Sequence, residues 1–173
     1  TLPAPPEAGI TLSNAKNVRV YDFRVRGFSN GIFIREFGGQ RATNNVIRNC
    51  TLLSNLYFGV QILGAFASAN RVVSNAFEGK NIQDIGVKIV DGGRNIIGNN
   101  TIMNHTQNGI DISGTGSTNI MTGNSIQSNT LIGVNIVGTA ADGNRIASNM
   151  FDGKSRQDTA VKIDGGDGNV VTN

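Results

Sequence analysis

Apolar and polar residues alternate along this chain in a two-part phrase that recurs through the whole sequence. The first half reads N-x-[IV]-x-x-N-x-[IVF], and the second half reads G-[IV]-x-[IL]. The apolar residue that opens the first half recurs at steps of 24 to 27 residues, at Val20, Ile47, Val72, Ile97, Met121, Ile146 and Val171. A fixed period of this length is typical of a solenoid, in which each copy is one structural unit.

The second half of the phrase keeps the same period. It begins at Gly9, Gly31, Gly59, Gly86, Gly109 and Gly133, with Ala160 in the seventh copy. Alternation within each half is the period of a strand with one buried face. The apolar runs span about three to five residues, which is too short for typical helices. The sequence therefore predicts an all-β solenoid, a parallel β-helix of about seven coils with two or three short strands per coil.

Asparagine recurs at two further places in the repeat. One register holds Asn45, Asn70, Asn95, Asn119, Asn144 and Asn169, and the other holds Asn75, Asn100, Asn124 and Asn149. Stacked asparagine side chains can hydrogen-bond along the solenoid axis, and asparagine tolerates the left-handed geometry of tight corners. We expect two interior ladders. The second starts only at the third coil, because Phe23 and Cys50 occupy its earlier places.

The pattern resembles the right-handed parallel β-helix repeat of pectate lyases, polygalacturonases, alginate lyases and epimerases, and phage tailspikes, over essentially the whole chain. The resemblance implies a single-stranded right-handed parallel β-helix, a carbohydrate context, and an extracellular or cell-surface location. None of the catalytic motifs of these families occurs in this chain, so the resemblance assigns no catalytic residue. The chain has no D-P-H like that of alginate epimerases, no N-T-D or G-H-G like those of polygalacturonases, and no R-x-P-x-x-R like that of pectate lyases.

The two ends of the chain differ from the repeat. Residues 1–8 carry all three prolines and are expected to form an extended lead-in, because proline cannot join a ladder centrally. The β-helix is expected over 9–173. The phrase stops midway at its C-terminal end, so we expect a truncated β-helix there. We also expect Ile163 and Val171 to be covered by another chain, through a homo-oligomer or end-capping, or else left exposed.

In G-[IV]-x-[IL] the apolar residues point inward, so x points outward. This outward row consists of Thr11, Phe33, Gln61, Lys88, Asp111, Asn135 and Lys162. Neighbours in the row should lie about 4.8 Å apart, one strand spacing. We therefore expect Lys88 and Asn135 to flank Asp111.

The candidate catalytic residues are Asp111, Lys88 and His105, the only histidine, which precedes Asp111 in a loop. Together, such groups could neutralise a uronate carboxylate, abstract its C5 proton and donate a proton to the leaving group. Because these side chains are predicted to face outward, substituting them should cost under about 0.5 kcal/mol of stability. The alternative is that Lys88 and Asp111 form an ordinary cross-strand ion pair and that His105 is an exposed loop residue.

Four further residues complete the candidate site as substrate-binding groups. Arg35, in the adjacent outward row, could contact a carboxylate in a bidentate manner. The full substrate-binding set is Arg35, Gln61, Asn135 and Lys162.

Composition narrows the range of partners. The net charge of +3 and pI of about 9.4 favour an acidic polysaccharide such as a polyuronate. Lysine and arginine do not cluster, which argues against nucleic acid, and no apolar run is long enough to span a membrane. The single cysteine, Cys50, allows no internal disulfide and is expected to be buried.

No cofactor or metal site is expected from the sequence. The stretch 164–169 (DGGDGN) faintly resembles a calcium-binding Gly-Asp nonapeptide, but it occurs once, and a turn between strands is the preferred interpretation.

The function that the sequence favours is a carbohydrate-interacting β-helix similar to polysaccharide lyases and epimerases, with acidic polysaccharide as its partner. Two alternatives stay open. One is a non-catalytic structural or adhesive β-helix, such as a spike, surface or scaffold segment. The other is a piece of a longer β-helix whose active site lies elsewhere.

Overall fold

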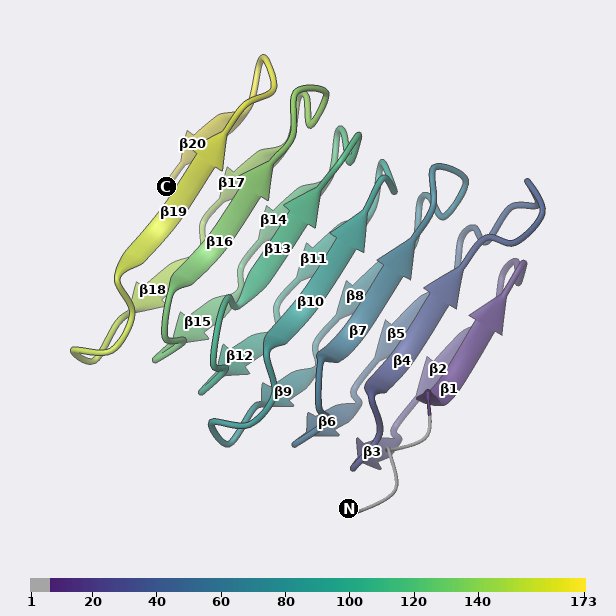
Figure 1. The fold of residues 1–173 in the computed structure, drawn as a ribbon, viewed down its shortest axis with the longest axis horizontal. Helices are drawn as coiled ribbons and strands as arrows, with labels where there is room; N and C mark the ends of the chain where they lie inside the picture. The colour runs from purple at the N-terminus through teal and green to yellow at the C-terminus, as the bar shows by residue number, and fades with distance from the viewer. Residues whose placement is uncertain (1–6) are drawn as a thin grey trace.

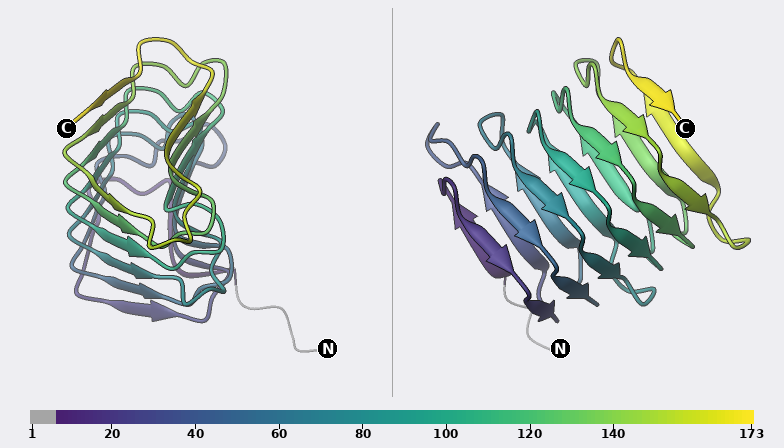
Figure 2. Two further views of the ribbon diagram at one scale, coloured as in Figure 1. Left: turned by 90° about the vertical axis from the view of Figure 1, so that its left-hand side faces the viewer. Right: turned by 180° about the vertical axis from the view of Figure 1, so that it is seen from behind.

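The computed structural model describes residues 7–173, which wind into a rod of stacked coils (Figure 1). Each full coil contributes one strand to each of three parallel sheets, so strands three apart in number are neighbours. Figure 2 (left) looks along the rod and shows the coils one behind another. Residues 7–173 contain no helix, and thus none that could cross a membrane. The predicted all-β solenoid of about seven coils is confirmed.

The first sheet contains the longest strands and lies toward the viewer in Figure 1. Its strands are β1 (Ala8–Ser13), β4 (Asn30–Arg35), β7 (Phe58–Leu63), β10 (Ile85–Val90), β13 (Ile110–Ser113), β16 (Ile132–Val137) and β19 (Thr159–Asp164). These strands carry the second half of the repeated phrase. The predicted lead-in falls mainly on residues 1–6, outside the described residues.

The other two sheets carry the first half of the phrase, as strands of three residues. The second sheet contains β2 (Arg19–Tyr21), β5 (Val46–Arg48), β8 (Arg71–Val73), β11 (Ile96–Gly98), β14 (Ile120–Thr122), β17 (Arg145–Ala147) and β20 (Val170–Thr172). The third contains β3 (Arg24–Arg26), β6 (Thr51–Leu53), β9 (Ala76–Glu78), β12 (Thr101–Met103), β15 (Ser125–Gln127) and β18 (Met150–Asp152).

The core is a set of apolar columns running along the rod. In the first sheet Ile62, Ile89 and Ile112 are in register on consecutive strands, and each is fully buried. A single coil could not bury such residues, because the neighbouring coils supply the surface above and below them. The alternating pattern of the sequence thus becomes one continuous hydrophobic core.

Both predicted asparagine ladders are present in the interior. Asn75 donates from its backbone nitrogen and from Nδ2 to Oδ1 of Asn100, at 2.8 and 3.1 Å. Asn100 makes the same pair of bonds to Asn124. Cys50 occupies the next rung, where its backbone donates to Asn75 Oδ1 at 2.9 Å and its thiol faces Val20 O at 3.7 Å. Its predicted burial is confirmed, and burial raises the pKa of the thiol.

The glycine that begins the second half of the repeat is required by close packing in the first six coils, and only the last coil has alanine there, Ala160. A Cβ on Gly109 would lie 2.7 Å from the carbonyl oxygen of Gly133 and 2.9 Å from Ile126. Contacts this short force the neighbouring atoms to move, so a side chain here would separate adjacent coils. Glycine at this point lets the third sheet turn directly into the first.

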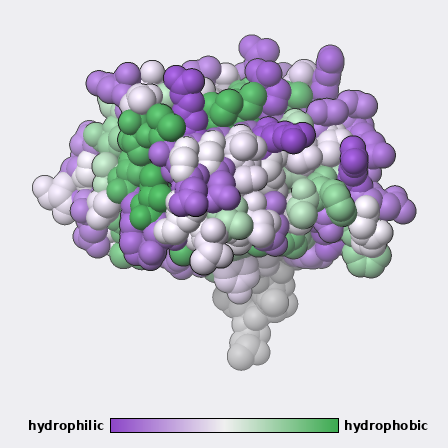
Figure 3. Space-filling model, turned by 90° about the horizontal axis from the view of Figure 1, so that it is seen from above, coloured by the Kyte–Doolittle hydropathy of each residue, from purple (hydrophilic) through white to green (hydrophobic). Residues whose placement is uncertain are grey.

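At the C-terminal end of the rod, apolar residues are exposed. Ile163 is 38% exposed and Val171 is 53% exposed, beside a hollow of about 310 Å³ lined in part by Phe151 and Val161. In Figure 3 hydrophobic colouring gathers toward the left, where β19 and β20 lie.

Candidate functional site

The predicted outward row exists on the first sheet with the expected register. Lys88 pairs with Gln61 on one side and Asp111 on the other, and Asp111 pairs in turn with Asn135. Lys162 follows on β19, in register with Asn135. The alternation of inward and outward residues therefore places these five side chains on adjacent strands.

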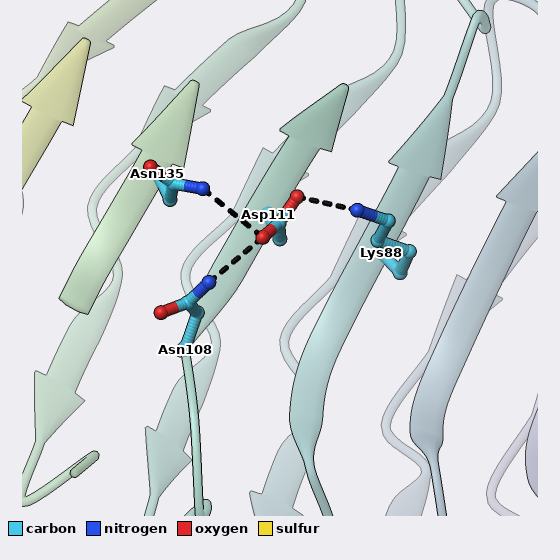
Figure 4. A network of polar contacts seen from close by, with 4 residues as sticks. All are labelled: Lys88, Asn108, Asp111 and Asn135. Atoms are coloured by element: carbon cyan, nitrogen blue, oxygen red, sulfur yellow. Dashed lines mark hydrogen bonds and ion pairs between the residues drawn. The ribbon is translucent and has the colours of Figure 1, made fainter. Parts of the chain in front are cut away.

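Asp111 is the centre of a polar network on this row (Figure 4). Its Oδ1 accepts a charged hydrogen bond from Lys88 Nζ at 2.6 Å. Its Oδ2 accepts from Asn108 Nδ2 at 2.7 Å and from Asn135 Nδ2 at 3.2 Å. Both carboxylate oxygens are thus held by donors from β10, from β16 and from Asn108, two residues before β13.

Asn108 is a member of the site that the sequence reasoning missed. It is buried and precedes Gly109. The same Asn-Gly pair occurs at Asn30, which donates from Nδ2 to Gln61 Oε1 at 3.1 Å. An asparagine directly before the repeated glycine therefore reaches the outward row, and its presence in two copies of the repeat was a signal available in the sequence.

The network is more buried than the sequence suggested. The side chain of Asp111 is 8% exposed and that of Lys88 is 18% exposed, whereas the Lys162–Asp164 pair, at 3.7 Å, is 54% and 67% exposed. Asp111 is therefore not the exposed residue that the expectation of a low cost assumed, and we now expect its substitution to cost more stability than the sequence suggested. Removing Lys88 alone would leave a poorly solvated carboxylate, which is strongly unfavourable.

His105 does not join this face, which corrects its predicted place as an exposed loop residue beside Asp111. It is fully buried inside the solenoid, where its Nδ1 lies 2.8 Å from Asn129 Oδ1. That oxygen also accepts the His105 backbone N–H, so Nδ1 is the protonated nitrogen. Burial lowers the pKa of His105 to about 4, partly opposed by the hydrogen bond to Asn129. A neutral, enclosed imidazole cannot reach a ligand on the outer face.

Neither Arg35 nor Lys162 bonds to Asp111. Arg35 lies at the end of β4, which β7 and β10 separate from β13. Its guanidinium pairs with Glu7 at 3.2 Å and stacks 5.3 Å from the ring of Phe33. The structure thus brings Lys88, Asp111 and Asn135 into direct contact, with Gln61 and Lys162 as the next residues along the row.

Within residues 7–173, no group of three or more His, Cys, Asp or Glu side chains is arranged to hold a metal ion. The stretch 165–169 forms the turn between β19 and β20. In that turn Asp167 donates from its backbone nitrogen to Asp142 Oδ1 at 2.7 Å.

Comparison with known proteins places this architecture in a family. Residues 8–173 match the family described as right-handed β-helix region. The chain belongs to this family. No curated protein sequence matches it.

Solved structures of this fold include enzymes. The chain is similar to the periplasmic alginate epimerase AlgG, with a TM-score of 0.67 and 17% identity over 94% of this chain and 42% of the other. It is also similar to the Agl-KA catalytic domain, with a TM-score of 0.66 and 17% identity over 91% of this chain and 36% of the other. At this identity the likeness shows a shared fold. The chain spans about two-fifths of the length of these structures.

Proposed function

We propose that this β-helix binds an acidic polysaccharide along the outer face of the first sheet, across the row from Gln61 to Lys162. The observation that carries the proposal is the network in which Lys88, Asn108 and Asn135 hold Asp111. Such a concentration of fixed polar groups on regular strands is suited to recognition, because the strands hold each group in position. The net charge of +3 and the polysaccharide-related name of AlgG, a protein of the same fold, support this ligand class.

Each residue in the row has a distinct part in this proposal. The Lys88 ammonium bonds one oxygen of Asp111 and has further N–H groups that could meet a uronate carboxylate. Neutralising a uronate carboxylate makes its C5 hydrogen more acidic. Asp111 is the only carboxylate in this outward row and would be the proton acceptor in a lyase or epimerase reaction. His105 has no part in this chemistry, because it is enclosed in the core.

The proposal includes a location outside the cytoplasm, because long acidic polysaccharides are extracellular or envelope materials. The similar AlgG is described as periplasmic, which supports this expectation.

The test combines binding with an activity screen on alginate, pectate and glycosaminoglycans. Binding should weaken steeply as salt rises, because exposed charges are screened. Lyase activity would appear as absorbance of unsaturated uronate, and epimerase activity as proton exchange at C5. A neutral glycan that binds better than alginate or pectate at low salt would contradict the proposal.

Substitutions then locate the site. In the double variant Lys88→Met/Asp111→Asn, both charges are removed together, so that no lone buried charge remains. We expect its polyuronate affinity at this face to fall at least about tenfold, and any lyase or epimerase activity to be lost. The matched control is Lys154→Met/Asp152→Asn, which removes an exposed pair 3.9 Å apart. If the site variant and the control bind equally well, the outer face around Asp111 is not the site.

A further inference from the structure

A second hollow lies among the loops that follow the long strands. Its volume is about 470 Å³, and its lining includes Arg41, Phe66, Asp91, Arg94 and Thr115. It shares no lining residue with the network around Asp111. Figure 3 views the molecule from the side on which these loops lie, and the middle of that face is mostly white and purple.

Loop length accounts for the hollow. The connection between β10 and β11 spans only 91–95, whereas the connections before it span 36–45 and 64–70, and the one after it spans 114–119. Because coils stack in register, a short loop between longer ones leaves a depression across several coils. The depression is therefore a fixed feature of the fold.

Two arginines in this hollow have no partner of opposite charge. Within residues 7–173, neither Arg41 nor Arg94 takes part in an ion pair, although Asp91 lies in the same lining. Asp91 bonds instead to Thr115, another residue of the lining: its Oδ1 accepts from Thr115 N at 2.9 Å and from Thr115 Oγ1 at 3.3 Å. Both guanidinium groups are thus available to an anion, and guanidinium binds carboxylate with two parallel hydrogen bonds.

The backbone around these arginines is fixed. Arg94 adopts a left-handed conformation with φ of 59°, and its N–H donates to Ser117 O at 3.0 Å. Phe66 O accepts from the backbone of Ala42, next to Arg41, at 3.1 Å. Bonds between successive coils therefore hold both arginine positions, so their side chains extend from a rigid base.

An exposed aromatic ring accompanies the two charges. Phe66 is 46% exposed and lies in the lining between the coils that carry Arg41 and Arg94. Its backbone N–H donates to Glu36 Oε2 at 2.7 Å, which fixes the loop. A sugar ring that covers Phe66 would bury apolar surface, while the neighbouring Ser117 and Thr118 offer hydroxyl groups to sugar hydroxyls.

We propose that this hollow is a second binding site, for a carboxylated oligosaccharide that spans the two arginines with a sugar ring on Phe66. Arg41 and Arg94 come from coils two apart, so their backbones are separated by about 10 Å, two strand spacings, along the rod axis. A ligand with more than one acidic sugar unit can offer each arginine its own carboxylate, whereas a lone inorganic anion would have to be shared between them and would not cover Phe66. The inference shares its ligand class with the proposed function but rests on different residues.

The test is titration calorimetry of the whole chain with a short oligomannuronate or oligogalacturonate. The wild type should show two sites per chain. Arg41→Ala/Arg94→Ala should retain only one, as should Lys88→Met/Asp111→Asn, and the combined variant should retain none. Arg41→Lys/Arg94→Lys keeps the charge but loses the fork geometry, and should weaken the second site about tenfold. Phe66→Ala should weaken the same site without removing it.

The control removes two arginines of equal charge from another face. Arg24→Ala/Arg26→Ala changes β3, whose arginine side chains are exposed, and should keep both sites within about threefold in affinity. Circular dichroism and thermal unfolding confirm that each variant is folded.

The outcomes separate the two proposals. If Arg41→Ala/Arg94→Ala still shows two sites, or if inorganic sulfate or a neutral oligosaccharide fills this site as tightly as the carboxylated one, the inference is overturned. Suppose that the wild type shows a single site, which Arg41→Ala/Arg94→Ala abolishes and Lys88→Met/Asp111→Asn leaves unchanged. The inference then holds and the proposed outer-face site fails. If the wild type binds no carboxylated oligosaccharide, both fail.

Discussion

Two of the columns of polar side chains in the interior differ in regularity. At the corner between the second and third sheets, Asn75, Asn100, Asn124 and Asn149 repeat one pattern of bonds. At the corner after the third sheet, the corresponding column contains Asn55, Gln83, His105, Asn129 and Gln157. Asn55 N–H donates to Gln83 Oε1, and His105 N–H donates to Asn129 Oδ1, so amide oxygens cap backbone donors in both columns.

The difference arises from the length of the chain at each corner. The first corner always has two residues between strands, as at 74–75 and 99–100, so every rung meets the next at the same height. The second corner varies in length. His105 lies three residues after the inward-facing residue of the preceding strand, whereas Gln83 lies six residues after the inward-facing residue of its preceding strand. A corner of constant length permits a uniform asparagine ladder, whereas a corner of variable length requires side chains of different lengths.

Breaking the regular ladder should have the largest effect. In Asn100→Ala the side chain loses its bonds to Val72 O and Asn124 Oδ1, and the Asn75 N–H loses its acceptor. Several buried polar groups then lack partners, and we expect a loss of about 3–5 kcal/mol in the free energy of unfolding. Chemical denaturation followed by circular dichroism measures it. The control Gln107→Ala removes an exposed amide and should cost under about 0.5 kcal/mol. Equal costs would mean that the ladder contributes nothing particular.

The irregular column, which contains His105, should make the folding stability of the protein sensitive to acid. Burial lowers the pKa of folded His105 to about 4, below the ordinary value of 6.5, so the unfolded chain binds the proton first. The stability contributed by the neutral imidazole is complete above pH 6.5 and is lost as the pH falls toward 4. The shift corresponds to about 3 kcal/mol.

The comparison for this prediction is His105→Asn. Asn55 and Asn129 enter the same column with the same spacing, so asparagine suits the position, and it also removes the buried Nε2 that has no hydrogen-bond partner among the described residues. We expect its unfolding free energy to fall about 3 kcal/mol less than that of the wild type between pH 7 and pH 4. Parallel pH curves for the two proteins would show that His105 does not titrate on unfolding.

The two columns also explain which features the sequence could predict. The regular ladder, the stacking of coils and the row around Asp111 follow from a fixed period, so residue numbers alone place Lys88 and Asn135 beside Asp111. His105 was misplaced because loop length varies at its corner, and a lone histidine in a loop carries no sign of direction. The sequence does carry one sign of this column, because Gln83 and Gln157 occupy equivalent places in two similar loops, 79–84 (GKNIQD) and 153–158 (GKSRQD).

Other features depended on three-dimensional detail. Asp111 is buried, and one of its three donors is Asn108, which bonds the carboxylate from outside the regular row. The hollow between Arg41 and Arg94 depends on the relative lengths of neighbouring loops. The repeat pattern predicts the features that recur in every coil. Both candidate binding surfaces depend partly on features that do not recur, namely Asn108 and the unequal lengths of neighbouring loops.

The smallest expected effect concerns the rung where the regular ladder ends. Cys50 donates from its backbone to Asn75 Oδ1, but its thiol, a weak donor, lies 3.3 Å from Arg48 O and 3.7 Å from Val20 O. In Cys50→Asn the new Nδ2 could donate to Val20 O, as Asn75 Nδ2 donates to Ile47 O at 3.1 Å. We expect a gain of about 1 kcal/mol, because one well-formed buried hydrogen bond replaces a weak one. Cys50→Ala is the control and should lose about 1 kcal/mol, since it removes packing without adding a bond. Urea denaturation of the three proteins orders them, and an asparagine variant less stable than the alanine variant would show that the ladder cannot be extended past the third coil.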